Sequence, residues 1–126
     1  MSELGLSDLV TTVDTYLAAW TEPDAGRRRA MVADVWEADG RLVDPPLAAV
    51  GVDGISDLFA ALQGQFPGHT FRRASGVDSH HDQFRFAWEL VAPDGDVALA
   101  GLDVGETAPD GRIRRITGFF GDVPPV

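Results

Sequence analysis

The spacing of apolar residues changes once along this chain, and this change restricts the fold class more than any other feature. Up to about residue 67, and apart from a short strand-like stretch at 41–44, apolar side chains recur every three or four positions, as on one face of an amphipathic helix. Beyond it they alternate with polar residues or form short runs, and the turn sequences APDGD (92–96) and APDG (108–111) separate these runs. Helices followed by antiparallel strands predict an α+β fold.

The same patterns predict the bounds of the elements. Helices are expected over residues 7–20, 23–40 and 53–67. Strands are expected near residues 41–44, 70–77, 81–91, 97–106 and 112–120. We expect the sheet to curl around the helices into a cone with one open end, which can hold a small molecule. Residues 1–126 then form a single domain.

Composition and charge exclude several classes of protein. The formal net charge is −10, so a surface that binds nucleic acid is not expected. All 10 basic side chains are arginine, which excludes lysine Schiff bases. The chain has no cysteine, so disulfides and thiolate nucleophiles are excluded. We see neither a membrane-spanning run nor a secretory signal, and we expect a cytoplasmic protein without membrane contact. We interpret the run at 27–29, three arginines, as the solvated face of a helix.

Asp44 is the first candidate for chemistry, within the stretch GRLVDPPLAAVGVDG (40–54). It ends the short predicted strand and precedes Pro45, which has no backbone N–H and so removes one amide to which a turn aspartate could bond. The proline also biases Asp44 towards an extended conformation. Two interpretations stay open, namely a base held out from the end of a strand and a solvated turn residue.

Two further polar side chains fall on apolar faces. Tyr16 shares a helix face with Leu9 and Val13, so its hydroxyl needs a hydrogen-bond partner. Asp103 shares strand parity with Leu99, and a carboxyl buried there must find a partner or stay protonated with a raised pKa. The alternatives are a core tyrosine bonded to a backbone carbonyl and an aspartate at the rim of the sheet.

Three segments together resemble a known family. They are TYLAAW (15–20), GRLVDPP (40–46) and GLDVGETAPDGRIRRITGFFG (101–121). They are similar to the first helix, the first strand and the last hairpin of ketosteroid isomerase, a member of the NTF2-like superfamily, to which the SnoaL-like polyketide cyclases also belong. The resemblance implies an NTF2-like cone, with three N-terminal helices packed in a curved, mostly antiparallel sheet. It also implies that Tyr16 and Asp103 donate hydrogen bonds to an enolate oxygen, while Asp44 moves the proton.

Strand parity and this resemblance predict the lining of a binding pocket. The side chains expected to point into the cone are those of Trp20, Leu58, Phe84, Phe86, Trp88, Gly118 and Phe120. Small glycines opposite large aromatic residues favour a flat or small ligand. His80 shares parity with Phe84 and is a candidate second acid–base group, unless a bulge exchanges it with His81.

Metals and cofactors are not expected. His80 and His81 would face opposite ways on a strand, and no third ligand is visible. The chain also carries no P-loop, no glycine-rich dinucleotide fingerprint and no G-x-S-x-G nucleophile motif.

The leading hypothesis is an isomerase or cyclase that transfers a proton next to a carbonyl group of a small apolar ligand. A non-catalytic module that binds such a ligand is the alternative. Epoxide hydrolysis would need an arginine between two carboxylates, and the candidate Arg85 has the wrong parity. An apolar row on the outer face of the sheet predicts a homodimer through that face. The row consists of Ala98, Ala100, Leu102 and Val104.

Overall fold

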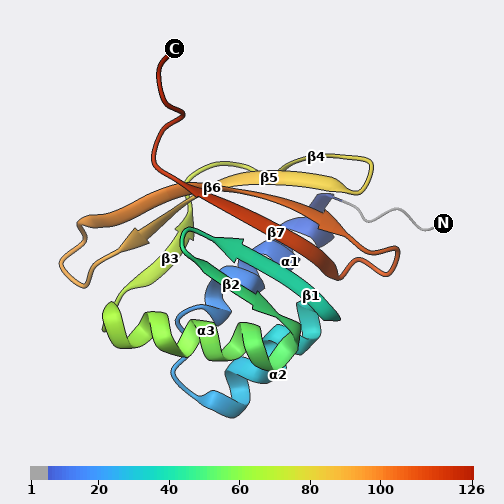
Figure 1. The fold of residues 1–126 in the computed structure, drawn as a ribbon, viewed down its shortest axis with the longest axis horizontal. Helices are drawn as coiled ribbons and strands as arrows, with labels where there is room; N and C mark the ends of the chain where they lie inside the picture. Colours follow the sequence, from blue (N-terminus) through green and yellow to red (C-terminus); the bar gives the residue numbers. More distant parts are fainter. Residues whose placement is uncertain (1–5) are drawn as a thin grey trace.

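Three helices pack against a curved sheet in residues 6–126, the part of the chain that this computed structural model describes (Figure 1). The helices are α1 (Leu6–Ala19), α2 (Ala25–Val35) and α3 (Gly51–Gln65). The strands are β1 (Trp36–Asp44), β2 (Leu47–Val50), β3 (Thr70–Arg73), β4 (Asp78–His80), β5 (Gln83–Val91), β6 (Val97–Thr107) and β7 (Ile113–Phe120). The predicted α+β class is confirmed.

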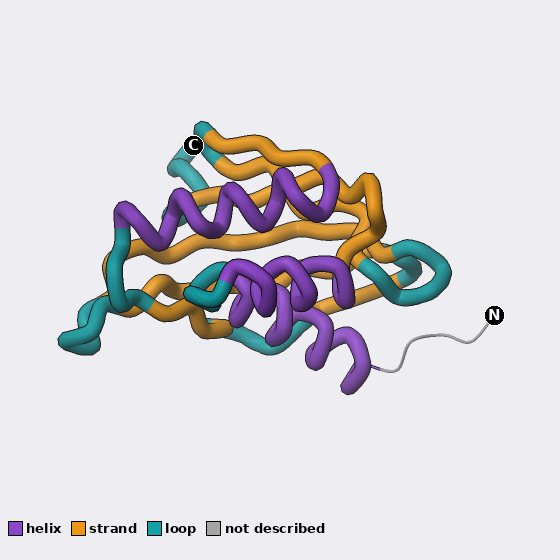
Figure 2. The backbone as a smooth tube through the Cα atoms, turned by 90° about the horizontal axis from the view of Figure 1, so that it is seen from below, coloured by secondary structure: helices purple, strands orange, loops and turns teal. Residues whose placement is uncertain are grey.

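The strands form one sheet in the order β2-β1-β7-β6-β5-β3, and β4 pairs with β5 beside this path. The pair of β1 and β7 is parallel, and the other pairs are antiparallel. Seen from below, the helices lie in front of the strands, so they cover one face of the sheet (Figure 2). Within residues 6–126, no helix combines the length and the apolar character needed to cross a bilayer.

The core lies between the helices and the concave face of the sheet. The predicted stripe of α1 is buried there through Leu9, Val13, Tyr16 and the following Trp20. Each large apolar side chain removed from water contributes about 1.5–3 kcal/mol to folding. The stripe therefore fixes how α1 is rotated about its axis, and it turns Tyr16 towards the sheet.

The second helix is shorter than predicted, and the strand after it is longer. Asp24 caps α2, because its carboxylate accepts a hydrogen bond of 2.8 Å from the backbone N–H of Arg27. The helix ends at Val35, so the prediction that it reaches residue 40 is wrong. Trp36 begins β1 instead, because its backbone pairs with β7 far along the sequence. Such tertiary pairing overrides local periodicity.

A strand that the sequence did not predict, β2, follows the turn at Pro45-Pro46 and pairs with β1. The third helix begins directly after it, at Gly51 rather than at Asp53. The return of the chain along β1 holds the end of that strand in place. Asp44 pairs with Leu47 of β2, and the preceding Val43 pairs with Thr117 of β7, so the end of β1 is held on both sides.

The edge of the sheet near β5 also differs from the prediction. The strand expected over 70–77 ends at Arg73, and β4 forms a separate short strand. His81 adopts a left-handed conformation with a φ of 54° in the turn between β4 and β5. Because this turn interrupts the chain, β5 begins at Gln83 and not at residue 81.

The arginine run does not lie entirely in solvent. Arg27 and Arg29 are exposed, but Arg28 is buried. Its guanidinium donates to the backbone carbonyl of Glu22 at 2.9 Å and to the hydroxyl of Ser56 at 3.3 Å. Arg28 therefore ties the loop between α1 and α2 to α3, and our interpretation of this residue as solvated was wrong.

Candidate active site

Three polar side chains from distant parts of the sequence meet inside the fold. Tyr16 comes from the last turn of α1, Asp44 from the last position of β1, and Asp103 from the middle of β6. Their exposed fractions are 1%, 7% and 3%, respectively. Burial alternates along β1, which turns Asp44 to the inner face of the sheet together with Leu42. The structure thus brings together the three residues that the sequence analysis singled out.

Asp103 makes two hydrogen bonds through its two oxygens. The hydroxyl of Tyr16 lies 3.3 Å from Oδ2, and Nε1 of Trp88 donates to Oδ1 at 3.0 Å. Phe86 on β5 pairs directly with Asp103 on β6, and Trp88 is the diagonal neighbour of Asp103. The bond from Trp88 was not predicted, although the register of the β5–β6 hairpin places these two residues on one face.

Asp44 lies next to Asp103 because residue 118 is a glycine. A Cβ atom at Gly118 would overlap Oδ1 of Asp44 and would stand 2.9 Å from Oδ1 of Asp103. The two carboxyl groups therefore share the space above this glycine. Oδ1 of Asp44 is buried and has no hydrogen-bond partner among the described residues. A buried acceptor without a donor is costly, and such groups are frequent at functional sites.

Burial changes the ionisation of all three groups. It raises the pKa of Asp44 to about 6. Burial and, second, the charge of Asp44 raise the pKa of Asp103 to about 8, while the bonds from Trp88 and Tyr16 oppose this rise. Burial and the two neighbouring carboxylates raise the pKa of Tyr16 well above its usual value. Between these values, Asp44 is ionised while Asp103 and Tyr16 keep their protons.

This arrangement can support acid–base chemistry. Two interacting carboxyl groups titrate as a pair, and the first proton leaves at the lower of the two pKa values. At neutral pH the pair holds one proton, so a base and hydrogen-bond donors stand side by side in a site of low polarity. Such a site can accept a proton from carbon and stabilise the oxyanion that forms.

Aromatic rings surround the cluster formed by Tyr16, Asp44 and Asp103. Trp20 stacks on Phe59 with ring centroids 4.0 Å apart, and Phe71 contacts both Trp20 and Trp88. Phe120 packs edge-on against Trp88 and is 43% exposed, so it lies at the solvent-facing rim of this group of aromatic rings. Phe59 and Phe71 were not predicted as part of this surface, although Phe59 lies on the expected apolar face of α3.

Other predicted pocket residues lie close to the cluster or in the core. Phe84 and Phe86 are buried with parallel rings 6.2 Å apart, and Leu58 is half-buried against the core. The glycines do not leave room for a flat ligand in this structure. The indole of Trp88 occupies the space above Gly101, as the carboxyl of Asp44 does above Gly118.

His80 is not brought to the cluster. It is exposed on β4, and its Nδ1 lies 3.1 Å from Nδ1 of His81. The left-handed turn at His81 allows the two rings to meet, so our expectation that they face opposite ways was wrong. No group of three or more potential metal ligands occurs within residues 6–126. Arg85 is also exposed, where it pairs with Asp78.

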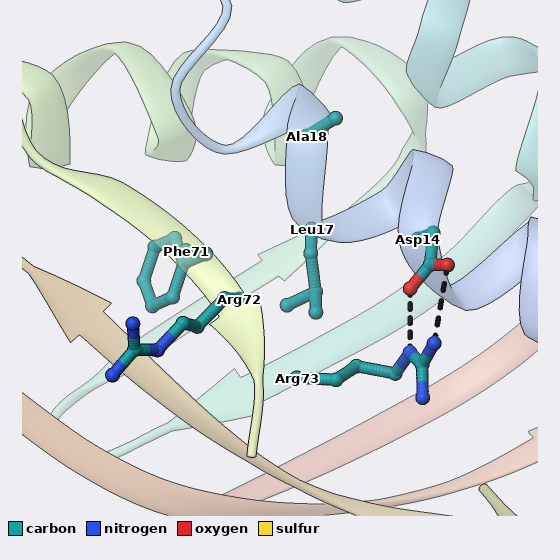
Figure 3. Close-up of a pocket in the computed structure, with 6 residues that line it drawn as sticks. All are labelled: Asp14, Leu17, Ala18, Phe71, Arg72 and Arg73. Carbon is teal, nitrogen blue, oxygen red and sulfur yellow. Dashed lines mark hydrogen bonds and ion pairs between the residues drawn. The ribbon is translucent and has the colours of Figure 1, made fainter. Parts of the chain in front are cut away.

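Among the cavities that the described residues form, two open on the surface away from Tyr16, Asp44 and Asp103. One, of about 340 Å³, lies at the β4–β5 hairpin and is lined by Asp78, His80, Gln83, Phe84, Arg85 and Val104. The other, of about 330 Å³, lies between α1 and β3 (Figure 3). Arg73 bonds to Asp14 across it, and Phe71, which lines it, also packs edge-on against Trp88. Neither cavity could be predicted from the sequence, because both depend on how edge strands meet the rest of the fold.

Comparison with known proteins identifies the family. The chain is 39% identical to a proposed isomerase of the SnoaL-like family from Agrobacterium tumefaciens strain C58, and the match covers 92% of this chain and 99% of that chain with a TM-score of 0.86. A proposed SnoaL-like polyketide cyclase from Jannaschia sp. CCS1 shares the fold at 16% identity, with a TM-score of 0.72 and coverage of 95% and 90%.

A third neighbour, from Catenulispora acidiphila DSM 44928, has a ketosteroid isomerase-like fold and was solved in complex with trimethylamine. It is 16% identical, with a TM-score of 0.70 and coverage of 87% of this chain and 85% of that chain. No family model matches the chain, and no curated protein matches it. On the strength of the match to the Agrobacterium protein, this chain belongs to the SnoaL-like family and has the NTF2-like, ketosteroid isomerase-like fold.

Proposed function

We propose that this protein transfers a proton next to a carbonyl group of a small ligand, in a reaction of the isomerase or cyclase type. The observation that carries this proposal is the buried oxygen of Asp44, which has no donor and lies beside Asp103. The similarity to a proposed isomerase supports the same reaction class.

The reaction would begin at the α-carbon of the ligand. The carboxylate of Asp44 takes a proton from that carbon, and the electron pair of the broken C–H bond moves to give an enolate. Tyr16 and Asp103 donate hydrogen bonds to the enolate oxygen. Return of the proton to another carbon gives an isomer, whereas attack of the enolate carbon on a second carbonyl closes a ring. Both outcomes need no redox partner.

Access to the site requires movement. Because Tyr16, Asp44 and Asp103 are at most 7% exposed, a ligand reaches them only when a covering side chain shifts. Phe120, at the rim, borders Trp88 and is the most exposed ring of the aromatic cluster. The aromatic surroundings favour an apolar ligand with a single carbonyl group facing the acids.

A non-catalytic binding module is the second candidate. The complex of the Catenulispora protein with trimethylamine supports it, since the same fold can hold a small molecule. The two candidates differ in one observable property. Only an enzyme of the proposed type exchanges solvent deuterium into the α-carbon of a bound ketone.

Phenols test the proposed donors, because a phenolate oxygen mimics an enolate oxygen. We expect affinity to rise with the acidity of the phenol. Asp103→Asn keeps a donor and should largely preserve binding, whereas Asp103→Leu should weaken it by about 1–3 kcal/mol. Titration calorimetry with phenols of graded acidity measures this difference. Small phenols and cyclic ketones are screened first, so that size alone does not exclude the ligand. Equal affinities for all three proteins would contradict the assignment of Asp103.

We also propose a homodimer through the outer face of the sheet. Ala98 and Ala100 are exposed and Leu102 and Val104 half-buried on this face. Phe119, which is 56% exposed and pairs with Leu102, extends the apolar row. Exposed apolar rows of this kind usually mark an interface.

Sedimentation velocity at micromolar concentration should give the mass of a dimer, and Leu102→Glu should give a monomer, because the interface would then bury an unpaired charge. A wild-type protein that sediments as a monomer would contradict the proposed dimer.

A further inference from the structure

Trp88 is held firmly in contact with the acid. Its indole is 5% exposed and lies over Gly101, where a Cβ atom would overlap the ring. Phe71 and Phe120 pack edge-on against it from two sides. The nitrogen Nε1 therefore has little freedom, and it points at Oδ1 of Asp103 at 3.0 Å.

An indole N–H can only donate. Oδ1 of Asp103 must therefore act as an acceptor, whether the carboxyl group is charged or neutral. When Asp103 is neutral, its proton belongs on the other oxygen. That oxygen is Oδ2, which accepts a hydrogen bond of 3.3 Å from the hydroxyl of Tyr16 when Asp103 is ionised. A proton on Oδ2 reverses this bond, because Oδ2 then donates to the hydroxyl oxygen of Tyr16.

We propose that Trp88 is a positioning residue, whose indole N–H keeps the acidic proton of Asp103 on Oδ2, beside Tyr16. This inference rests on the proposed function, since it concerns the donors offered to an enolate oxygen. It assigns to Trp88 a role beyond lining the pocket.

The number of available donors explains why the position of this proton matters. With the proton on Oδ2, the Tyr16–Asp103 pair has two O–H groups next to each other, so at least one remains for a ligand oxygen. Without the indole N–H, the proton can move to Oδ1. Oδ2 then accepts the hydrogen bond of Tyr16, which withdraws that donor from the ligand. Loss of one N–H should thus weaken binding although it never touches the ligand.

The first test compares two tryptophan variants. Trp88→Phe should weaken the binding of 4-nitrophenol about 10-fold, the effect of losing one buried hydrogen bond. Trp36→Phe is the matched control, because Trp36 is also fully buried but its Nε1 bonds to no group in the described part of the chain. The control should keep the wild-type affinity. Equal affinity of W88F and wild type would overturn the proposal.

The second test does not depend on how well W88F folds. In ¹⁵N–¹H spectra, the indole signal of Trp88 should shift with pH as Asp103 loses its proton. Asp44 and Tyr16 face Asp103 from β1 and α1. Asp103→Asn removes the titration of residue 103 and leaves those of Asp44 and Tyr16. If the shift of the Trp88 signal reports the ionisation of Asp103, the shift should therefore disappear in D103N. A Trp88 signal that does not move in the wild-type protein, or that moves equally in D103N, would overturn the proposal.

Failure of the inference can be told apart from failure of the proposed function. Deuterium exchange by the wild-type protein, combined with unchanged binding in W88F, would refute only the role of Trp88. A Trp88 signal that reports Asp103, combined with weakened binding in W88F, supports the positioning role even if no ketone exchanges deuterium. In that case the proposed catalysis fails, and the donors serve a binding module.

Discussion

Asp44→Asn is expected to abolish deuterium exchange at the α-carbon of a bound ketone without weakening phenol binding. The amide has the shape of the carboxylate but cannot accept the proton, and loss of a general base lowers a rate by about 10²–10⁴-fold. Phenol binding should persist because Tyr16 and Asp103, the donors proposed for the phenolate oxygen, remain in place. Removal of the buried negative charge of Asp44 also removes repulsion of the phenolate.

Proton NMR or mass spectrometry of a cyclic ketone in deuterated water measures this exchange. The matched control is Asp39→Asn, since Asp39 lies on the same strand but is exposed. In the wild-type protein the rate should rise as Asp44 ionises, around its pKa of about 6, and fall as Asp103 ionises, around its pKa of about 8. Exchange at the wild-type rate in D44N would exclude Asp44 as the base.

Asp103→Asn is expected to stabilise the folded protein at neutral pH. Burial raises the pKa of Asp103 from 3.8 to about 8. From about pH 4 to about pH 8, the carboxyl loses its proton in the unfolded chain but keeps it in the folded protein. This difference lowers the free energy of unfolding. Each unit of pKa difference corresponds to about 1.4 kcal/mol, so the stability lost at pH 7 amounts to about 4 kcal/mol at most. Asparagine does not ionise, so the variant does not lose this stability.

The sign of this effect can be checked across pH. A raised pKa means that the stability present at low pH is lost as pH rises from about 4 to about 8, and that the loss then stops. Urea unfolding at several pH values should therefore show D103N and wild type diverging over this range, with D103N more stable by about 2–4 kcal/mol at pH 7. Asp39→Asn should follow the wild-type curve. Parallel curves for D103N and wild type would show that Asp103 is not buried as an acid.

The destabilisation of the fold by Asp103 and the role proposed for this residue would have one cause. A carboxyl that is kept neutral in an apolar interior destabilises the fold, yet this same condition makes it a hydrogen-bond donor at neutral pH. Asp44 follows the same logic with a smaller shift of its pKa. A chain whose only requirement was to fold would not place two acids over one glycine.

Local sequence patterns determined much of this architecture. The helical stripe of α1 depends on the spacing of residues a few positions apart, and this spacing turns Tyr16 inwards whatever the rest of the chain does. The alternation of β6 likewise placed Asp103 on the inner face, and the proline after Asp44 marked the end of β1. The resemblance to ketosteroid isomerase then connected three residues that local patterns could only place one at a time.

Contacts between distant segments decided the rest. Trp36 continues a helical spacing, yet its pairing with β7 makes it the first residue of β1. His80 has the parity of a pocket residue, but the left-handed turn at His81 leaves it on an exposed edge. The bond from Trp88 to Asp103 and the contact of Asp44 with Gly118 depend on the register and curvature of the sheet. Periodicity tells which way a side chain points, whereas only the packing of strands and helices from distant parts of the chain decides which side chains meet.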